Sequence, residues 1–319
     1  MKAWIFNKEK IEIKDIDKPI LLENEVLIKT KAISLNPVDY KITKGAFGLS
    51  TPRVIGIDVA GVIEEVGSNC NKELLKKRVI ALVDIFTSGS FSEYVRVDKN
   101  IITEIPNEVT FEEASTIPCA GVTAYQAVKE KINIRKKQTV FITVGNGSVG
   151  KFAIQLAKLQ GAKVIVSANS DIEKLKEIGA DYIIDYKNED IHDRVNEITN
   201  NKGVDYIVDM LSSDNISENV DLLRFNGSIV GITGIPETYP FEPFTKAAGL
   251  IEVALAAAYL DGDEDSLKEI SIAASELLEL VKEKKIKLDI SNVIKFEEID
   301  TYLNSFEDNS VKGKIVVKL

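Results

Sequence analysis

A glycine-rich loop between a strand and a helix constrains the fold of this chain more than any other feature. Residues 139–144 read TVFITV, which is typical of a strand buried on both faces. The pattern Gly-x-Gly-x-x-Gly follows at Gly145, Gly147 and Gly150, and a helical segment continues over residues 151–160. A strand, this loop and a helix in that order form the dinucleotide-binding fingerprint. The sequence therefore predicts a pyrophosphate site at the N-terminus of the helix.

Each of the three glycines has its own predicted role. Gly145 permits a tight turn, Gly147 lets the backbone approach a pyrophosphate without an intervening Cβ, and Gly150 lets the helix pack closely on the strand. The alternative is an ordinary strand-to-helix turn of another α/β protein. The β-α units that surround the loop favour the dinucleotide site.

From about residue 121, short apolar runs alternate with helical segments, as in β-α-β units. We expect strands rich in β-branched residues over residues 139–144, 163–168, 182–184, 204–209 and 228–232. Helices are expected over residues 151–160 and 172–178, followed by Gly161 and Gly179 where left-handed caps are required. The alternation predicts an α/β fold with a doubly wound parallel sheet.

The rest of the chain differs in pattern. Short β-rich segments separated by turn residues are found at residues 3–6, 25–32, 61–66, 78–82 and 91–97. They predict a mainly antiparallel β domain, to which we also assign a helix at 265–284 and a final strand at 314–319. Since 319 residues exceed the usual size of one core, we expect two domains. Residues 1–118 and 252–319 would form the β domain, and residues 119–251 the dinucleotide-binding domain.

The charge balance and the hydrophobic pattern exclude several classes of partner. Fifty acidic and forty basic side chains give a net charge of −10, which opposes binding to nucleic acid or to anionic lipid. The first ten residues become charged before a signal-peptide core could form, and the apolar stretch at 247–260 is too short to span a bilayer. We therefore expect a cytoplasmic protein that binds neither nucleic acid nor membrane.

Metal-ligating residues are few. The chain has two cysteines, Cys70 and Cys119, and one histidine, His192. A disulfide framework and a four-cysteine zinc site are therefore excluded, and a catalytic metal would depend mainly on carboxylate ligands. We predict no metal site.

The residues after the second predicted strand bear on the choice of cofactor. An NAD site usually places a carboxylate there to bond the ribose hydroxyls, whereas an NADP site avoids that charge. Here the polar, uncharged run SANS, which includes Ser167 and Asn169, precedes Asp171. Lys174 follows one helical turn later and could supply a cation. The run favours NADPH, Asp171 opposes it, and NADH remains possible.

Four ordered motifs resemble one family of enzymes over essentially the whole chain. They are SLNPVDYK at residues 34–41, GIDVAGVIEEVG at 56–67, GSFSEY at 89–94, and the glycine loop continuing into FAIQLAK at 152–158. The chain resembles the zinc-independent quinone and enone reductases of the medium-chain dehydrogenase/reductase superfamily. The resemblance implies a GroES-like N-terminal domain, a Rossmann domain and commonly a homodimer.

The resemblance also implies chemistry without zinc. Zinc-dependent relatives carry Gly-His-Glu where this chain has Gly56, Ile57 and Asp58, and they carry a cysteine ligand near the position of Asn36. Isoleucine cannot coordinate a metal, so polarisation of the substrate by zinc is not expected. At its position Asp58 is expected to be structural, bonded to backbone or to a Lys or Arg side chain.

Direct hydride transfer from nicotinamide remains, and it generates an oxyanion or enolate that hydrogen-bond donors can stabilise. Asn36 and Tyr40 are the candidate donors. The alternative is that Asn36 and Pro37 form a turn on which Tyr40 packs. Similar bacterial quinone reductases place a tyrosine near Phe47, so this chain lacks that proton donor, but Phe47 could stack on a flat substrate.

Further assignments come from the resemblance alone. It places Thr123 near the nicotinamide, Ser148 and Val149 at the pyrophosphate, and Tyr186 beside the adenosine ribose or its phosphate. Thr123 could equally be a helix-face hydroxyl, and Tyr186 a surface aromatic. Lys314 in the last strand could reach the cofactor phosphate, but we expect it to be solvated.

Three functions follow from these features. The leading hypothesis is an NADPH-dependent reductase of quinones or of conjugated enones and enals, with a small-molecule substrate. A second is an enoyl-thioester reductase, because the same fold and hydride chemistry serve acyl-carrier substrates. A third is a non-catalytic dinucleotide-binding or structural protein, because fold alone does not fix function.

Overall fold

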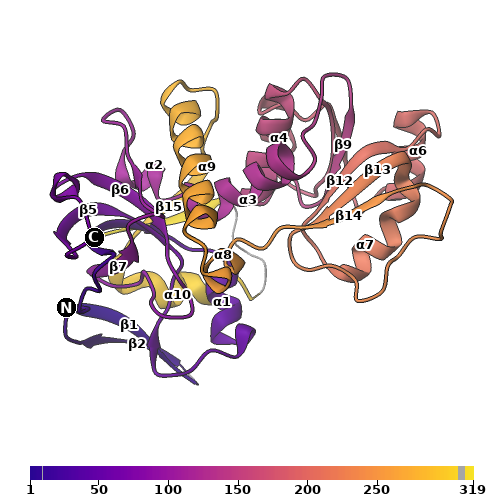
Figure 1. The fold of residues 1–319 in the computed structure, drawn as a ribbon. Coiled ribbons are helices and arrows are strands. Elements are labelled where there is room, and N and C mark those ends of the chain that lie inside the picture. The colour runs from indigo at the N-terminus through magenta and orange to yellow at the C-terminus, as the bar shows by residue number, and fades with distance from the viewer. Residues whose placement is uncertain (9, 308–312) are drawn as a thin grey trace. The chain divides into compact units, whose positions relative to one another are not determined.

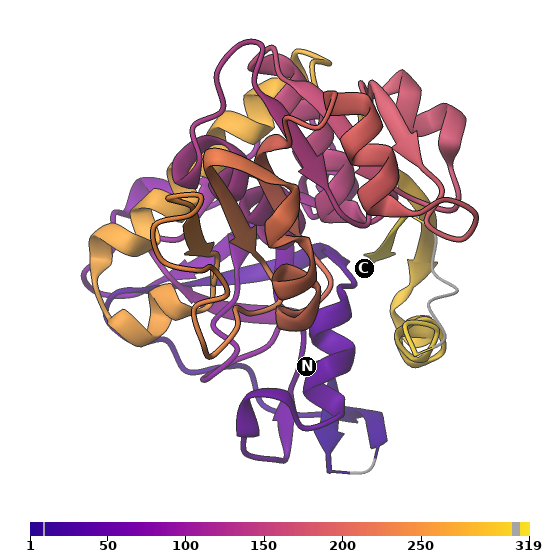
Figure 2. The same ribbon diagram turned by 90° about the vertical axis from the view of Figure 1, so that its right-hand side faces the viewer.

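The computed structural model describes residues 1–8, 10–307 and 313–319 and divides into two compact units. The first unit consists of Met1–Val122 and Leu255–Leu319, and the second unit of Thr123–Ala254. The sequence-based boundaries follow residues 118 and 251. Figure 1 labels many of the elements of both units, and Figure 2 shows the same ribbon turned by 90°.

The second unit contains a six-stranded, fully parallel sheet in the order β11-β10-β9-β12-β13-β14. The strands are β9 Thr139–Ile142, β10 Lys163–Ser167, β11 Tyr182–Ile184, β12 Val204–Asp209, β13 Leu223–Gly231 and β14 Gly249–Glu252. The helices are α3 Val122–Tyr125 at the unit boundary, α4 Ser148–Leu159, α5 Ile172–Glu177, α6 Ile191–Thr199 and α7 Ser213–Asn219. The predicted doubly wound sheet is confirmed.

The order of the strands reverses between β9 and β12. From β9 the chain builds outward through β10 and β11, and it then returns to place β12 on the other side of β9. This is the Rossmann order, in which ligands bind outside the carboxyl ends of the strands at the reversal. The loop after β9, which contains the three glycines, lies at that edge.

The sheet forms because its strands are apolar on both faces. Phe141, Ile165, Ile207 and Ile229 have no exposed surface, and each comes from a different strand. The helices end where the sequence predicts. Gly161 after α4 and Gly179 after α5 have φ angles of 79° and 114°, which are readily reached only by glycine.

The first unit contains two sheets built mainly from antiparallel strands. The larger has the order β15-β16-β3-β5-β6-β8, with β7 paired to β3, and the smaller has the order β2-β1-β4. The strands are β1 Lys2–Asn7, β2 Lys10–Asp15, β3 Glu25–Ser34, β4 Arg53–Val54, β5 Asp58–Val66, β6 Arg78–Leu82, β7 Tyr94–Asp98, β8 Thr103–Glu104, β15 Ile290–Lys295 and β16 Lys314–Lys318. The helices are α1 Pro37–Thr43, α2 Phe111–Ala114, α8 Ala257–Asp261, α9 Glu264–Lys282 and α10 Ile299–Asn304.

Several short elements of the first unit were not predicted, among them β2, β15 and α1. β2 is largely polar, β15 pairs in parallel with β16, and the short α1 begins at a proline. The sequences of β15 and α1 lack the strict apolar period on which recognition of a strand or helix depends.

The final strand β16 determines what lies beside the start of α1. β16 is antiparallel to β3, with Val316 opposite Ser34 and Val317 opposite Ile33. The backbone of Leu35 extends this pairing by donating to the carbonyl of Ile315 over 3.0 Å. This register brings Lys314, the first residue of β16, to the residues that follow β3.

Candidate functional site

The glycine loop, residues 145–150, connects β9 to α4. The amide of Gly145 donates to the carbonyl of Ser167 at 2.9 Å, which ties the loop to the end of β10. Gly147 is the N-cap residue of α4, and as a glycine it offers no side-chain hydrogen bond to the first amides of this helix. Its first amides and the positive end of its dipole are therefore suited to an anion.

The geometry around each glycine tests the predicted roles. A Cβ on Gly150 would lie 2.4 Å from the carbonyl oxygen of Val144, and one on Gly145 would lie 2.9 Å from the Cβ of Val166. A Cβ on Gly147 would be 3.3 Å from its nearest neighbour. Of the three glycines, Gly147 is therefore the one that packing within the protein requires least. An approaching ligand would explain its presence there.

The turn that contains Gly145 has one left-handed residue. That residue is Val144, with a φ of 52°, and Gly145 is not left-handed. Glycine is favoured at position 145 because the loop passes close to Val166 on β10. A β-branched residue rarely adopts a positive φ, and such strain tends to occur at functional sites.

The segment after β10 is tied to the glycine loop by two side-chain contacts. Nδ2 of Asn146 donates to Oγ of Ser170 over 2.8 Å. Nζ of Lys151, one residue beyond the last glycine, forms an ion pair of 2.8 Å with Oδ2 of Asp171. Asp171 has a left-handed backbone with a φ of 60° and is the N-cap residue of α5. No role for Lys151 is predicted from the sequence.

The other residues proposed for the cofactor lie around this edge. Ser167 is buried at the end of β10, Asn169 is half-buried in the segment that follows, and Lys174 is exposed on α5. Ser148 and Val149 begin α4 and are half-buried.

Two residues assigned from the resemblance alone are placed as follows. Tyr186 is 48% exposed and follows β11, whose end is joined to the end of β10 by a 3.0 Å bond from the amide of Ala168 to the carbonyl of Ile184. Thr123 is buried on α3. These are positions in the fold, and the cofactor roles of both residues stay predictions.

A buried carboxylate at the same edge was missed by the sequence analysis. Asp209 ends β12, and its Oδ1 accepts hydrogen bonds from the amides of Leu211 at 2.9 Å and Ser212 at 3.2 Å. Its Oδ2 has no hydrogen-bond partner among the described residues. Burial raises the pKa of the Asp209 carboxyl to about 6, against the hydrogen bonds that favour its charged form. A lone Asp at the end of a buried strand is the sequence signal that could have identified it.

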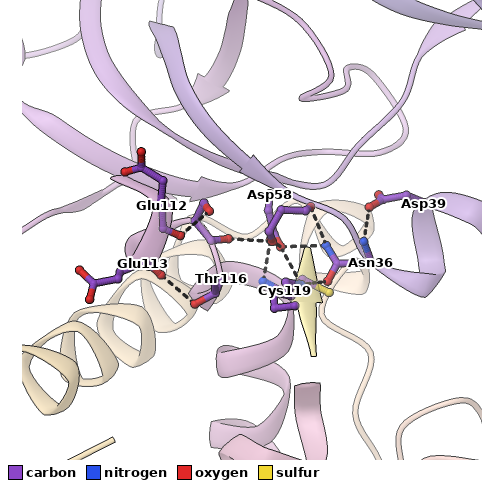
Figure 3. A network of polar contacts seen from close by, with 10 residues as sticks. Asn36, Asp39, Asp58, Glu112, Glu113, Thr116 and Cys119 are labelled. Carbon is purple, nitrogen blue, oxygen red and sulfur yellow. Dashed lines mark hydrogen bonds and ion pairs between the residues drawn. The ribbon is translucent and has the colours of Figure 1, made fainter. Parts of the chain in front are cut away.

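The first unit holds a second set of polar contacts, which includes Asn36 and Asp58 (Figure 3). Asn36 is the N-cap residue of α1, and its amide N–H donates to Oδ2 of Asp39 over 2.8 Å. Its side-chain Nδ2 donates to Oδ2 of Asp58 over 2.8 Å and to the carbonyl of Ser34 over 3.2 Å. Its Oδ1 accepts from Nζ of Lys314. We call Ser34, Asn36, Asp39, Asp58 and Lys314 the buried network.

Asp58 is the centre of the buried network and is fully buried. It accepts hydrogen bonds from Oγ of Ser34 at 2.6 Å and from the amide of Cys119 at 2.8 Å. Nζ of Lys314 lies 3.6 Å from its Oδ2. Burial raises the pKa of the Asp58 carboxyl, and the Lys314 charge opposes that rise. Asp58 makes the contacts expected of it, with backbone and with a lysine. The prediction that Lys314 is solvated is wrong, because Lys314 is buried at the start of β16.

The buried network bears on the predicted role of Asn36. Both hydrogens of its amide group are directed to protein acceptors, on Asp58 and Ser34. Donation to a substrate therefore requires one of these bonds to be exchanged.

The other two predicted substrate residues lie on or after α1. Tyr40 on α1 is half-buried, and Nζ of Lys44 lies 5.0 Å from the centre of its ring. Phe47 is 54% exposed, with a left-handed φ of 63°.

Asp39 gives the buried network a pH dependence. It is fully buried, and its Oδ1 has no hydrogen-bond partner among residues 1–8, 10–307 and 313–319. Burial raises the pKa of the Asp39 carboxyl to about 8, and the Asp58 charge raises it further, against the amide of Asn36 and the charge of Lys314. The folded state thus retains a proton that the unfolded chain loses near pH 4.

We expect the free energy of unfolding to fall as the pH rises from about 4 to about 8, because the folded state binds more protons over this window. Asp39→Asn removes one titrating group and should make that fall smaller, and the raised pKa values of Asp58 and Asp209 account for the rest. Urea titrations at pH 5.5 and 8.5 measure the fall, with Asp15→Asn at the exposed end of β2 as the control. A variant whose stability changes with pH as steeply as the wild type would contradict the assignment.

No cluster of three or more His, Cys, Asp or Glu side chains that could hold a metal ion is found in the described part of the chain. Among the same residues, no helix combines the length and the apolar composition needed to cross a bilayer.

Comparisons with known proteins agree with this architecture. Residues 22–107 match the model of the alcohol dehydrogenase GroES-like domain, and residues 148–270 match that of the zinc-binding dehydrogenase. A quinone oxidoreductase of Homo sapiens is 30% identical over 247 residues, which cover 76% of this chain and 74% of the relative. A chloroplast envelope quinone oxidoreductase homolog of Arabidopsis thaliana is 29% identical, over 97% of this chain and 94% of the relative.

The fold as a whole also has a solved counterpart. The crystal structure of an alcohol dehydrogenase superfamily protein from Novosphingobium aromaticivorans superimposes with a TM-score of 0.91 at 24% identity, covering 100% of this chain and 99% of that one. The predicted combination of a GroES-like domain and a Rossmann domain is thereby confirmed.

Proposed function

This chain is an oxidoreductase that belongs to the quinone oxidoreductase family of the medium-chain dehydrogenase/reductase superfamily, and from that membership we propose that it reduces quinones or α,β-unsaturated carbonyls with NADPH and without zinc. The observation that carries the proposal is the N-terminus of α4. Its N-cap residue is a glycine and provides no side-chain cap, and the helix follows a glycine loop at the carboxyl edge of a parallel sheet.

The residues of the second unit fit a nicotinamide dinucleotide. The amides of Gly147, Ser148 and Val149 would hold the pyrophosphate, while Gly145 and Gly150 keep the loop close to β10 and α4. When bound, the reduced nicotinamide supplies the hydride.

The remaining residues of the second unit would recognise the two ends of the cofactor. Thr123 would lie near the nicotinamide. Ser167, Asn169 and Tyr186 would surround the adenosine ribose, and Lys174 would face its 2′-phosphate.

In the first unit, α1 and the turn after it would contact the substrate. The hydroxyl of Tyr40 would donate a hydrogen bond to the oxygen on which negative charge develops, and Phe47 would stack on a flat substrate. Asn36 would join Tyr40 as a donor by exchanging one of its two amide contacts.

The zinc-free part of the proposal depends on Ile57. This residue is buried immediately before Asp58, at the position where zinc-dependent relatives carry histidine, and its side chain has no donor atom. From the family resemblance we further propose a homodimer located in the cytoplasm.

The proposal is tested by steady-state oxidation of NADPH and NADH with a panel of quinones, enals and an enoyl thioester, with and without a metal chelator. We expect turnover of a quinone or an enal, faster with NADPH and unchanged by the chelator. Turnover of the thioester alone would show that the substrates are enoyl thioesters and not quinones or enals. Loss of activity with the chelator would contradict the zinc-free mechanism. Cofactor binding without any turnover would indicate a non-catalytic protein.

A further inference from the structure

An ion pair stands beside the glycine loop where the two forms of the cofactor would differ. Nζ of Lys151 and Oδ2 of Asp171 are 2.8 Å apart, and their side chains are 5% and 26% exposed. Lys151 belongs to the first turn of α4, and Asp171 immediately precedes α5. The pair therefore joins the helix that would hold the pyrophosphate to the segment that follows β10.

The position of Asp171 relates the ion pair to the choice between NADPH and NADH. NADPH carries a phosphate on the 2′-oxygen of the adenosine ribose, and NADH carries a hydroxyl there. A carboxylate after the second strand of a Rossmann sheet accepts hydrogen bonds from ribose hydroxyls. Ser170, its neighbour, is held against the glycine loop by Asn146 at 2.8 Å, which keeps this segment at the cofactor edge.

We propose that Lys151 is the counter-ion that neutralises Asp171, and that this ion pair sets the preference of the enzyme between NADPH and NADH. The inference rests on the proposed function, because it concerns the same cofactor site. No cofactor contact is predicted for Lys151 from the sequence. Lys151 acts through Asp171 and is therefore a positioning residue.

The physical reason is electrostatic. A bare carboxylate beside the ribose repels a 2′-phosphate and is free to accept hydrogen bonds from the 2′-hydroxyl of NADH. With Lys151 in contact, one carboxylate oxygen is occupied and the local charge is cancelled. The pair is largely shielded from solvent, so this cancellation is screened less than at an open surface. Asp171 then ceases to oppose NADPH, and Lys174 one turn later can attract the phosphate.

The test measures the dissociation constants of NADPH and NADH for the full chain by calorimetric titration. Lys151→Met keeps the apolar stem and removes the charge, and it should lower the affinity ratio of NADPH to NADH by about tenfold or more. Asp171→Asn should raise the ratio. Lys151→Met combined with Asp171→Asn should return the ratio to the wild-type value or above, because no bare carboxylate remains.

A matched control lies on the same helix. Lys158 near the end of α4 forms a similar ion pair with Asp181 at 2.9 Å, and Lys158→Met should leave the ratio unchanged. If Lys151→Met does not fold, the affinity ratio of Asp171→Asn alone tests the inference. This variant is expected to fold because Asp171 is the more exposed partner. A ratio that moves less than about twofold in every folded Lys151 and Asp171 variant would overturn the inference. Failure of the wild type to bind either dinucleotide would instead overturn the proposed function.

Discussion

Replacing Lys314 with methionine should lower the free energy of unfolding by about 3–5 kcal/mol, the usual cost of removing one partner from a buried ion pair. Lys314 is 5% exposed, lies 3.6 Å from Asp58 and donates to Asn36. Without its charge, Asp58 and Asp39 would be two buried carboxyl groups with no cation of the buried network beside them. Urea unfolding at pH 7 measures the loss.

Two further variants make this result specific. Lys318→Met removes a lysine from the same strand whose ion pair with Glu112 is 66% exposed on the lysine side, and it should cost at most about 1 kcal/mol. Lys314→Met combined with Asp58→Asn should recover part of the loss, because the uncompensated charge is removed with its partner. If the free energy of unfolding of Lys314→Met lies within about 0.5 kcal/mol of the wild-type value, the usual range of surface substitutions, the buried network carries no charge.

Gly147→Val should abolish the stabilisation that the cofactor confers while leaving the apo protein folded. At a cofactor concentration of about 100 times the dissociation constant, the wild type should gain about 2.7 kcal/mol, and the variant should gain nothing measurable. The reason is that a side chain at Gly147 would stand between the first amides of α4 and the pyrophosphate. Thermal unfolding with and without NADPH gives both quantities.

Gly150→Val serves as the contrasting variant. Its Cβ would lie 2.4 Å from the carbonyl of Val144, a contact that the backbone can relieve only by shifting. We therefore expect Gly150→Val to lose stability even without cofactor. Equal cofactor stabilisation of Gly147→Val and wild type would show that the pyrophosphate does not bind at this loop.

The sequence allowed the second unit to be predicted well because its signals are local. An apolar strand, a glycine loop and a capped helix each occupy a few consecutive residues, and their alternation is sufficient to predict a parallel sheet. The strain at Val144 could not be foreseen, since nothing in the letters TVFITV shows that the last valine leaves the strand.

The contacts of the first unit were harder to predict because they join residues far apart in the chain. Asp58 was expected to bond backbone or a basic side chain, but the sequence does not say which one. The answer depends on the register of β16 against β3, which places Lys314 beside Asn36. Similarly, Lys151 was overlooked because a lysine on a helix is usually solvated, and only the path of the chain after β10 brings Asp171 to it.

The register of β16 also bears on the order in which the polypeptide matures. The residues of Thr123–Ala254 are consecutive, so the second unit can fold as soon as it leaves the ribosome. The carboxylate of Asp58 emerges before it, but the lysine that pairs with this carboxylate is translated after it, in the last strand. Asp58 therefore has no Lys314 beside it until the residues of the second unit have been synthesised.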